Sequence, residues 1–178
     1  IALAIALVVI ASLSSAFVSQ RKTFNTQEQI SEMIQNARAA TDMISAEVRM
    51  AGYNPTGSMQ TTDPTASNFV GIPYDTTQLK IIADLNEDGE TDGTLTGDDS
   101  NEEISYQYFD TVAYPKQIKR KTGNGTFQPL AENIQAFTFE YYNAAGSTTT
   151  TAADIREIKI TITSRTSKLD PDYGQNSG

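Results

Sequence analysis

Apolar residues fill the start of the chain and then recur at helical spacing. Residues 1–20 carry no charge, and neither Gly nor Pro occurs before Gly52. Gly52 and Pro55 are typical of a helix end, because Gly tolerates positive φ after the last turn and Pro cannot continue a helix. The pattern therefore predicts one continuous helix of about 50 residues, roughly 75 Å long at ~1.5 Å per residue.

The two halves of this helix differ in polarity. Residues 1–24 are expected to form the hydrophobic half: residues 1–11 are wholly apolar, residues 1–20 carry no charge, and about 20 residues suffice to cross the hydrocarbon core of a bilayer. Residues 25–52 carry many polar and charged side chains, so they are expected to be amphipathic and to pack on a sheet along one side. The predicted stripe has spacings of four and three: Ile30, Ile34, Ala37, Thr41, Ile44, Val48 and Ala51. The apolar half is expected to protrude.

The remainder of the chain predicts an antiparallel sheet. Residues 53–78 have no period and three prolines, so they are expected to form an irregular loop. Between residues 79 and 165, strands are predicted at 79–84, 103–109, 117–121, 126–130, 133–142 and 155–163. Asn124-Gly125 predicts a hairpin turn with positive φ at both residues.

These elements together predict an α+β fold. Residues 25–178 are expected to form one globular domain that ends in a tail, 166–178, without an apolar period. The isoleucines of the last strand are the expected partners of the helix stripe: Ile158, Ile160 and Ile162.

The composition of the chain excludes several classes of function. The net charge of −9 argues against binding to nucleic acid, and the one basic cluster, Lys116, Lys119, Arg120 and Lys121, is expected to lie on an exposed hairpin strand. The chain has no Cys and no His, which removes disulfides, thiol chemistry and the commonest general base. Ser14, Ser15 and Ser19 have no base beside them in the sequence to activate them. The sequence therefore predicts a protein that is not an enzyme.

An acidic segment after the first strand has the spacing of a calcium-binding loop. Oxygen-bearing side chains occupy alternate positions around Gly89: Asp84, Asn86, Asp88, Glu90 and Asp92. Leu95 stands where such a loop carries a bidentate acid. A replacement could come from Asp98, Asp99, Glu102 or Glu103. The alternative is a solvated acidic turn, although nine acids and no Lys or Arg between residues 84 and 103 would repel one another without a cation.

The succession of apolar helix, amphipathic helix, loop and sheet resembles a type IV pilin or pseudopilin. Residues 2–10 are similar to the helix that follows the prepilin cleavage site. Residues 35–55, which include Arg49-Met50-Ala51-Gly52-Tyr53, are similar to the helix end of PilW-like minor pilins, as are residues 84–108 and 129–134. The resemblance implies a precursor held in the inner membrane by its helix, cleavage and methylation by a prepilin peptidase, and assembly with other pilin subunits into an extracellular filament.

The chain departs from that family pattern at both ends. The N-methylated aromatic residue and the early carboxylate of mature pilins are absent, so a short segment is expected before Ile1. One further strand is expected after Gly178. Two other functions stay open: a pseudopilin of type II secretion, and a membrane-anchored module for calcium-dependent adhesion, for which Arg21-Lys22 would be the basic flank of the membrane segment.

Overall fold

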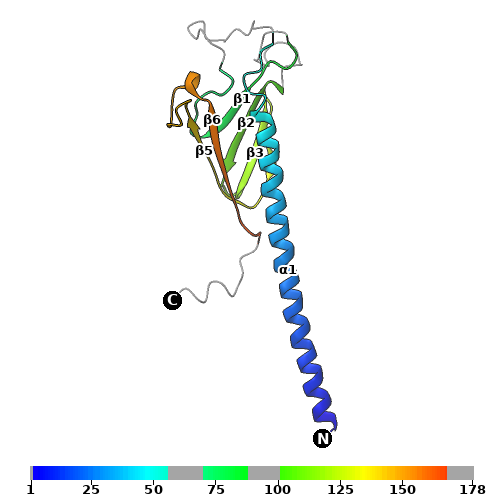
Figure 1. Ribbon diagram of the computed structural model, residues 1–178. Helices are drawn as coiled ribbons and strands as arrows, with labels where there is room; N and C mark the ends of the chain where they lie inside the picture. Colours follow the sequence, from blue (N-terminus) through cyan, green and yellow to red (C-terminus); the bar gives the residue numbers. More distant parts are fainter. Residues whose placement is uncertain (1, 56–69, 88–100, 168–178) are drawn as a thin grey trace. The chain divides into compact units, whose positions relative to one another are not determined.

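A computed structural model describes residues 2–55, 70–87 and 101–167, and these residues form a helix followed by antiparallel strands (Figure 1). The predicted α+β class is confirmed. The elements are α1 (Ala2–Val48), β1 (Gln78–Ile82), β2 (Glu103–Phe109), β3 (Gln117–Thr122), β4 (Gln128–Ala131), β5 (Ile134–Tyr142), the short 3-10 helix η2 (Ala152–Asp154) and β6 (Glu157–Ser164). Residues 36–165 form one compact unit, and α1 up to residue 35 belongs to another.

The long helix predicted from the sequence is present as a single element of 47 residues. It ends at Val48, and turns lead on to Gly52, which has the expected positive φ of +79°. The N–H of Gly52 donates to the carbonyl oxygen of Ile82 at 2.9 Å, and the N–H of Ile82 donates to Gly71 at 2.8 Å. A Cβ on Gly71 would overlap the backbone of Gly52, so the close approach of these two segments requires glycine. Backbone hydrogen bonds therefore tie the end of α1 to β1.

The strands form two sheets, whereas the sequence predicted one. The first sheet is an antiparallel meander in the order β1-β2-β3-β4, and the second is the antiparallel ribbon β5-β6. The chain leaves the first sheet at Asn133, which has a φ of +59°. The N–H of Ile134 then donates to the carbonyl of Lys116 at 2.9 Å, so β5 begins beside the start of β3. A left-handed Asn can redirect the chain in this way, and alternation alone does not reveal it.

The turn between β3 and β4 also differs from the prediction. Gly123 has positive φ, +47°, and Asn124 and Gly125 do not. The N–H of Gly125 donates to Thr122 at 2.9 Å, and a Cβ on Gly125 would lie 2.9 Å from the same carbonyl oxygen. The prediction of positive φ at Asn124-Gly125 was wrong because Gly123 adopts the left-handed conformation and Gly125 is needed for the close approach.

The core lies in the unit of residues 36–165, where α1 contributes Ala40 and Ile44. Its other buried members are Leu79, Ile81, Ile104, Tyr106, Ile118, Ala131, Ile134, Phe137 and Tyr141. The isoleucines of β6 are half-buried and pack against this cluster, to which α1 contributes Ala40 and Ile44. The predicted helix stripe was partly wrong, because Ile30, Ile34 and Thr41 are exposed. The buried positions of α1 are Ala40, Ile44 and Glu47, which also have spacings of four and three but lie on a face rotated slightly from the predicted stripe. A search for apolar residues misses this face because Glu47 is charged.

Candidate functional sites

The apolar half of α1 is the first candidate site, because its large apolar side chains are exposed. Leu3 is 75% exposed, Val8 66% and Phe17 61%. The helix contains an 18-residue window of mean hydropathy 2.0, none of it buried, so it is long and apolar enough to cross a membrane. A membrane anchor and a signal sequence both have these properties.

Two hydroxyl groups in this half donate hydrogen bonds within the helix. Ser12 Oγ donates to the carbonyl of Val8 at 2.8 Å, and Thr23 Oγ1 donates to Ser19 at 3.1 Å. Such bonds let a helix carry small polar residues into lipid without an unpaired donor. Small side chains are frequent here, and small residues allow close approach between helices: Ala4, Ala6, Ala11, Ser12, Ser14, Ser15 and Ala16.

The start of the acidic segment is the second candidate site. Of the predicted calcium ligands the structure describes Asp84 and Asn86, whereas Asp88, Glu90 and Asp92 lie outside the described residues. Asp84 is fully buried, its N–H donates to the carbonyl of Tyr53 at 2.8 Å, and its Oδ1 accepts the N–H of Glu87 at 2.7 Å. Glu87 has a φ of +69°. Backbone hydrogen bonds therefore hold the Asp84 carboxylate at the entrance of the segment.

Glu102 is a second buried acid at the start of this segment. It is 1% exposed, and its Oε1 accepts the N–H groups of Leu85 at 2.7 Å and Asn86 at 2.9 Å. Of the four acids considered as a replacement ligand, Glu103 instead pairs with Lys80 at 2.8 Å, and Asp98 and Asp99 lie outside the described residues. The sequence did not distinguish Glu102 from its neighbours, because burial and amide contacts depend on how the segment folds back.

The two buried carboxylates are chemically suited to a hard cation. Both accept hydrogen bonds from amides within the stretch 85–87, so they border the same short piece of backbone. Two buried acids disfavour each other's charge unless a positive group or a cation compensates it. Among the described residues there is no group of three or more acids, Cys or His that could hold a metal. The described part of the segment thus supplies two acids, Asp84 and Glu102, and the amide oxygen donor Asn86.

A buried polar cluster joins α1 to the first sheet, and sequence reasoning missed it. Arg120 donates to Glu47 Oε1 through Nη2 at 2.8 Å and through Nε at 3.1 Å, while the hydroxyl of Tyr106 donates to Glu47 Oε2. Burial and the adjoining Glu47 raise the pKa of Tyr106, so this hydroxyl stays protonated as a donor. Ile118 and Arg120 lie on one face of β3, because residues two apart in a strand share a face. The apolar Ile118 could therefore have indicated that Arg120 also points inward. The cluster fixes the end of α1 on β2 and β3.

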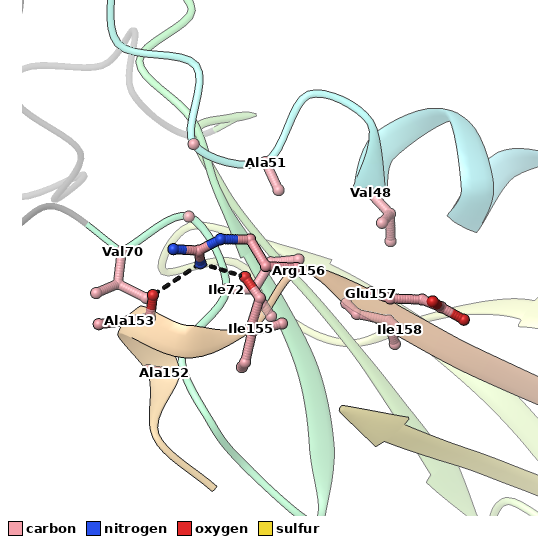
Figure 2. Close-up of a pocket in the computed structure, with 12 residues that line it drawn as sticks. Val48, Ala51, Val70, Ile72, Ala152, Ala153, Ile155, Arg156, Glu157 and Ile158 are labelled. Carbon is pink, nitrogen blue, oxygen red and sulfur yellow. Dashed lines mark hydrogen bonds between the residues drawn. The ribbon is translucent and has the colours of Figure 1, made fainter. Parts of the chain in front are cut away.

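A groove lies between the end of α1, the segment around Ile72 and the start of β6 (Figure 2). It encloses about 610 Å³, and its apolar walls include Val48, Ala51, Ile72, Ile155 and Ile158. Arg156 extends across it, and Nη1 of Arg156 donates to the carbonyls of Ala153 and Ile155, both at 2.8 Å. Sequence reasoning did not identify this groove, because its walls come from three separate stretches of the chain.

No family model, curated protein or solved structure matches the chain. The structure itself defines a class: an α+β protein with one long N-terminal apolar helix and antiparallel sheets.

Proposed function

We propose that the chain is a structural subunit of a type IV pilus-like extracellular filament, with the role of a minor pilin. The supporting observation is the apolar half of α1, whose side chains are exposed over the whole of a membrane-length window. Each large apolar side chain left in water forgoes about 1.5–3 kcal/mol of burial free energy. A helix with this many exposed apolar residues needs an apolar environment that its own chain does not supply.

Two successive environments meet that need. Lipid surrounds the apolar half while the subunit is held as a single-pass protein in the inner membrane. Equivalent helices of other pilin subunits surround it after assembly, and the small residues along the helix permit their close approach. The same segment therefore serves first as an anchor and then as the filament core, and the sheets belong to the separate unit of residues 36–165.

The filament proposal is tested by a charge in the apolar half. Ile10 is 59% exposed, and Ile10→Asp would place a carboxylate among neighbouring helices, at a cost of several kcal/mol. We expect loss of filaments in electron micrographs of cells producing this variant. The matched control is Met43→Asp, which changes a 40%-exposed apolar residue of the same helix within residues 36–165 and should leave filaments intact. Filaments of normal number and shape from Ile10→Asp would refute the proposal.

Electron microscopy of cells producing the protein also tests the two alternative functions, because neither of them forms surface filaments. A type II secretion pseudopilin would be required for export of other proteins without forming surface filaments. A calcium-dependent adhesive module would stay singly anchored in the membrane and mediate cell adhesion without assembly. Arg21 and Lys22, which follow the apolar segment, favour the anchored module as the second candidate, because basic residues flank many membrane spans.

We further propose that the acidic segment binds Ca²⁺. The predicted ligand set is Asp84, Asn86, Asp88, Glu90 and Asp92, and Glu102 provides the acid that Leu95 cannot. Calcium takes six to eight oxygen ligands, and the millimolar calcium outside cells can occupy a weak site. These residues would hold the cation, and its positive charge would offset the repulsion among the carboxylates of the segment.

Calorimetric titration of the full chain in detergent tests the calcium proposal. We expect heat of binding for Ca²⁺, and its loss in Asp84→Asn combined with Glu102→Gln. Glu103→Gln is the control, since the Glu103 carboxylate pairs with Lys80. Circular dichroism must show that each variant retains its helix and strands. No binding heat for the unmodified chain at millimolar Ca²⁺, with an unchanged melting temperature, would exclude the site.

A further inference from the structure

We propose that the turn between β2 and β3 of one copy docks into the groove at the start of β6 of a second copy, in a repeated head-to-tail contact. This inference rests on the proposed filament, because it supplies a contact between subunits. It adds an interface that lies wholly within residues 36–165 and involves no residue of the apolar helix half.

The turn presents an apolar tip on a well-defined backbone. Thr111 and Tyr114 exchange both backbone hydrogen bonds, at 3.2 and 3.1 Å, so Val112 and Ala113 are the two tip residues. Val112 has a relative exposure of 104%, which means that nothing in its own chain covers it. Turn tips commonly carry Gly, Asn, Asp or Ser, and a fully exposed Val at such a position provides an apolar surface for another molecule.

Packing beneath the tip keeps the turn in place. The ring of Tyr114 packs edge-on against Phe109 with centroids 6.3 Å apart, and Lys119 Nζ lies 3.0 Å from the Tyr114 centroid. Lys119 itself is 3% exposed. A preorganised turn loses little conformational entropy on docking, which favours it as the inserted element.

The groove offers apolar walls and a cation that has no acid partner in the described residues. Within the described residues, the guanidinium of Arg156 donates only through Nη1, to two carbonyls of its own segment, as the dashed lines of Figure 2 show. The carbonyls of Val112 and Ala113 accept no hydrogen bond within the described chain. Asp110, at the base of the turn, has a 43%-exposed side chain that pairs with Lys116 at 2.5 Å and keeps part of its carboxylate open to solvent. The turn therefore brings an apolar side chain, two free acceptors and a carboxylate to a groove with apolar walls and spare guanidinium donors.

Turn and groove lie at opposite ends of the same unit. Ile134 pairs with Ser164 and donates to Lys116, so the turn is at the Ser164 end of β6. The groove is at the other end, around Ile155 and Ile158. Eight residues of strand separate these ends by roughly 26 Å at ~3.3 Å per residue, so the turn cannot fill the groove of its own copy. A contact between two different surfaces that does not close on itself generates an open row of subunits, as a filament requires.

Cysteine cross-linking in the full chain tests the contact, because the chain has no natural cysteine. Val112→Cys and Ala153→Cys, introduced together in membranes and filaments from producing cells, should give a disulfide-linked ladder of dimers, trimers and larger species on oxidation. Either single variant should give at most dimers. The matched control is Glu132→Cys with Ala153→Cys, since Glu132 is exposed in the turn before β5, at the same end of the unit as Val112. Its ladder should be absent.

The outcomes separate this contact from the filament proposal. Filaments in electron micrographs together with the ladder support both. Filaments without a ladder overturn the contact and leave the filament proposal standing. A ladder in the Ile10→Asp background, in which no filaments are expected, would show that the contact forms without assembly through the helix, and it supports both proposals. Neither filaments nor a ladder overturns both. As a second readout, Val112→Asp should reduce filament number at least severalfold and Val112→Ile should not, and equal numbers would overturn the contact.

Discussion

Replacing Arg120 by Met tests whether the buried polar cluster fixes the end of α1 on the first sheet. Arg120 holds Glu47 through two nitrogens, at 2.8 and 3.1 Å, and the side chain of Glu47 is only 11% exposed. Met has a similar length and no charge. The variant therefore leaves the Glu47 carboxylate buried with Tyr106 as its remaining hydrogen-bond donor in the cluster.

The expected loss follows from the burial of the pair. Breaking a buried ion pair by removing one partner costs about 3–5 kcal/mol. The side chain of Arg120 is 25% exposed, so water already screens part of this interaction. We expect Arg120→Met to lower the free energy of unfolding by about 2–3 kcal/mol. For a unit of this size the melting temperature should fall by roughly 10 °C.

Thermal unfolding of the full chain in detergent, followed by near-ultraviolet circular dichroism, measures this loss. The double variant Glu47→Leu with Arg120→Met should be more stable than Arg120→Met alone, because no buried charge remains and Tyr106 forgoes only about 1 kcal/mol of hydrogen bonding. Lys159→Met is the control, because it breaks the exposed pair with Glu140 and should cost about 0.5 kcal/mol or less. A double variant as unstable as the sum of its two single variants would refute the reasoning.

Two further predictions concern the same unit. Burial raises the pKa of Tyr141 to about 12, above the ordinary value near 10, so the folded state retains this proton longer than the unfolded state. The resulting stability should be complete below about pH 10 and decline as the pH rises from about 10 to 12. Tyr141→Phe should flatten that part of a stability curve measured by chemical denaturation, and an unchanged alkaline slope would contradict the assignment. Gly71→Ala should cost more than about 2 kcal/mol, because its Cβ would overlap the Gly52 backbone. Gly146→Ala should cost only about 1 kcal/mol, since that site has open space and a φ of +75°. Equal melting temperatures for these two glycine variants would show that the approach of Gly71 to Gly52 is not tight.

Local patterns were sufficient to predict the helix and most strands. The uncharged run from Ile1 and the Gly52 terminator predicted α1 to within a few residues, because helix formation and termination depend on neighbours along the chain. Alternation located β2 at the residues that the structure assigns to it, Glu103 to Phe109. The calcium-binding loop predicted from its spacing stays a prediction, and of its five residues the structure describes Asp84 and Asn86.

Contacts between distant residues decided what the sequence could not. Glu47 is buried because Arg120 of β3 compensates its charge and Tyr106 of β2 donates a hydrogen bond to it, and this selects which face of α1 packs on the sheet. Two other features likewise depend on segments that meet only after folding. They are the contact of Glu102 with the backbone that follows Asp84, and the apolar groove that Arg156 crosses. Periodicity reports which positions along one element share a face. Which face becomes buried is decided by the partners that compensate its charges, and those partners come from elsewhere in the chain.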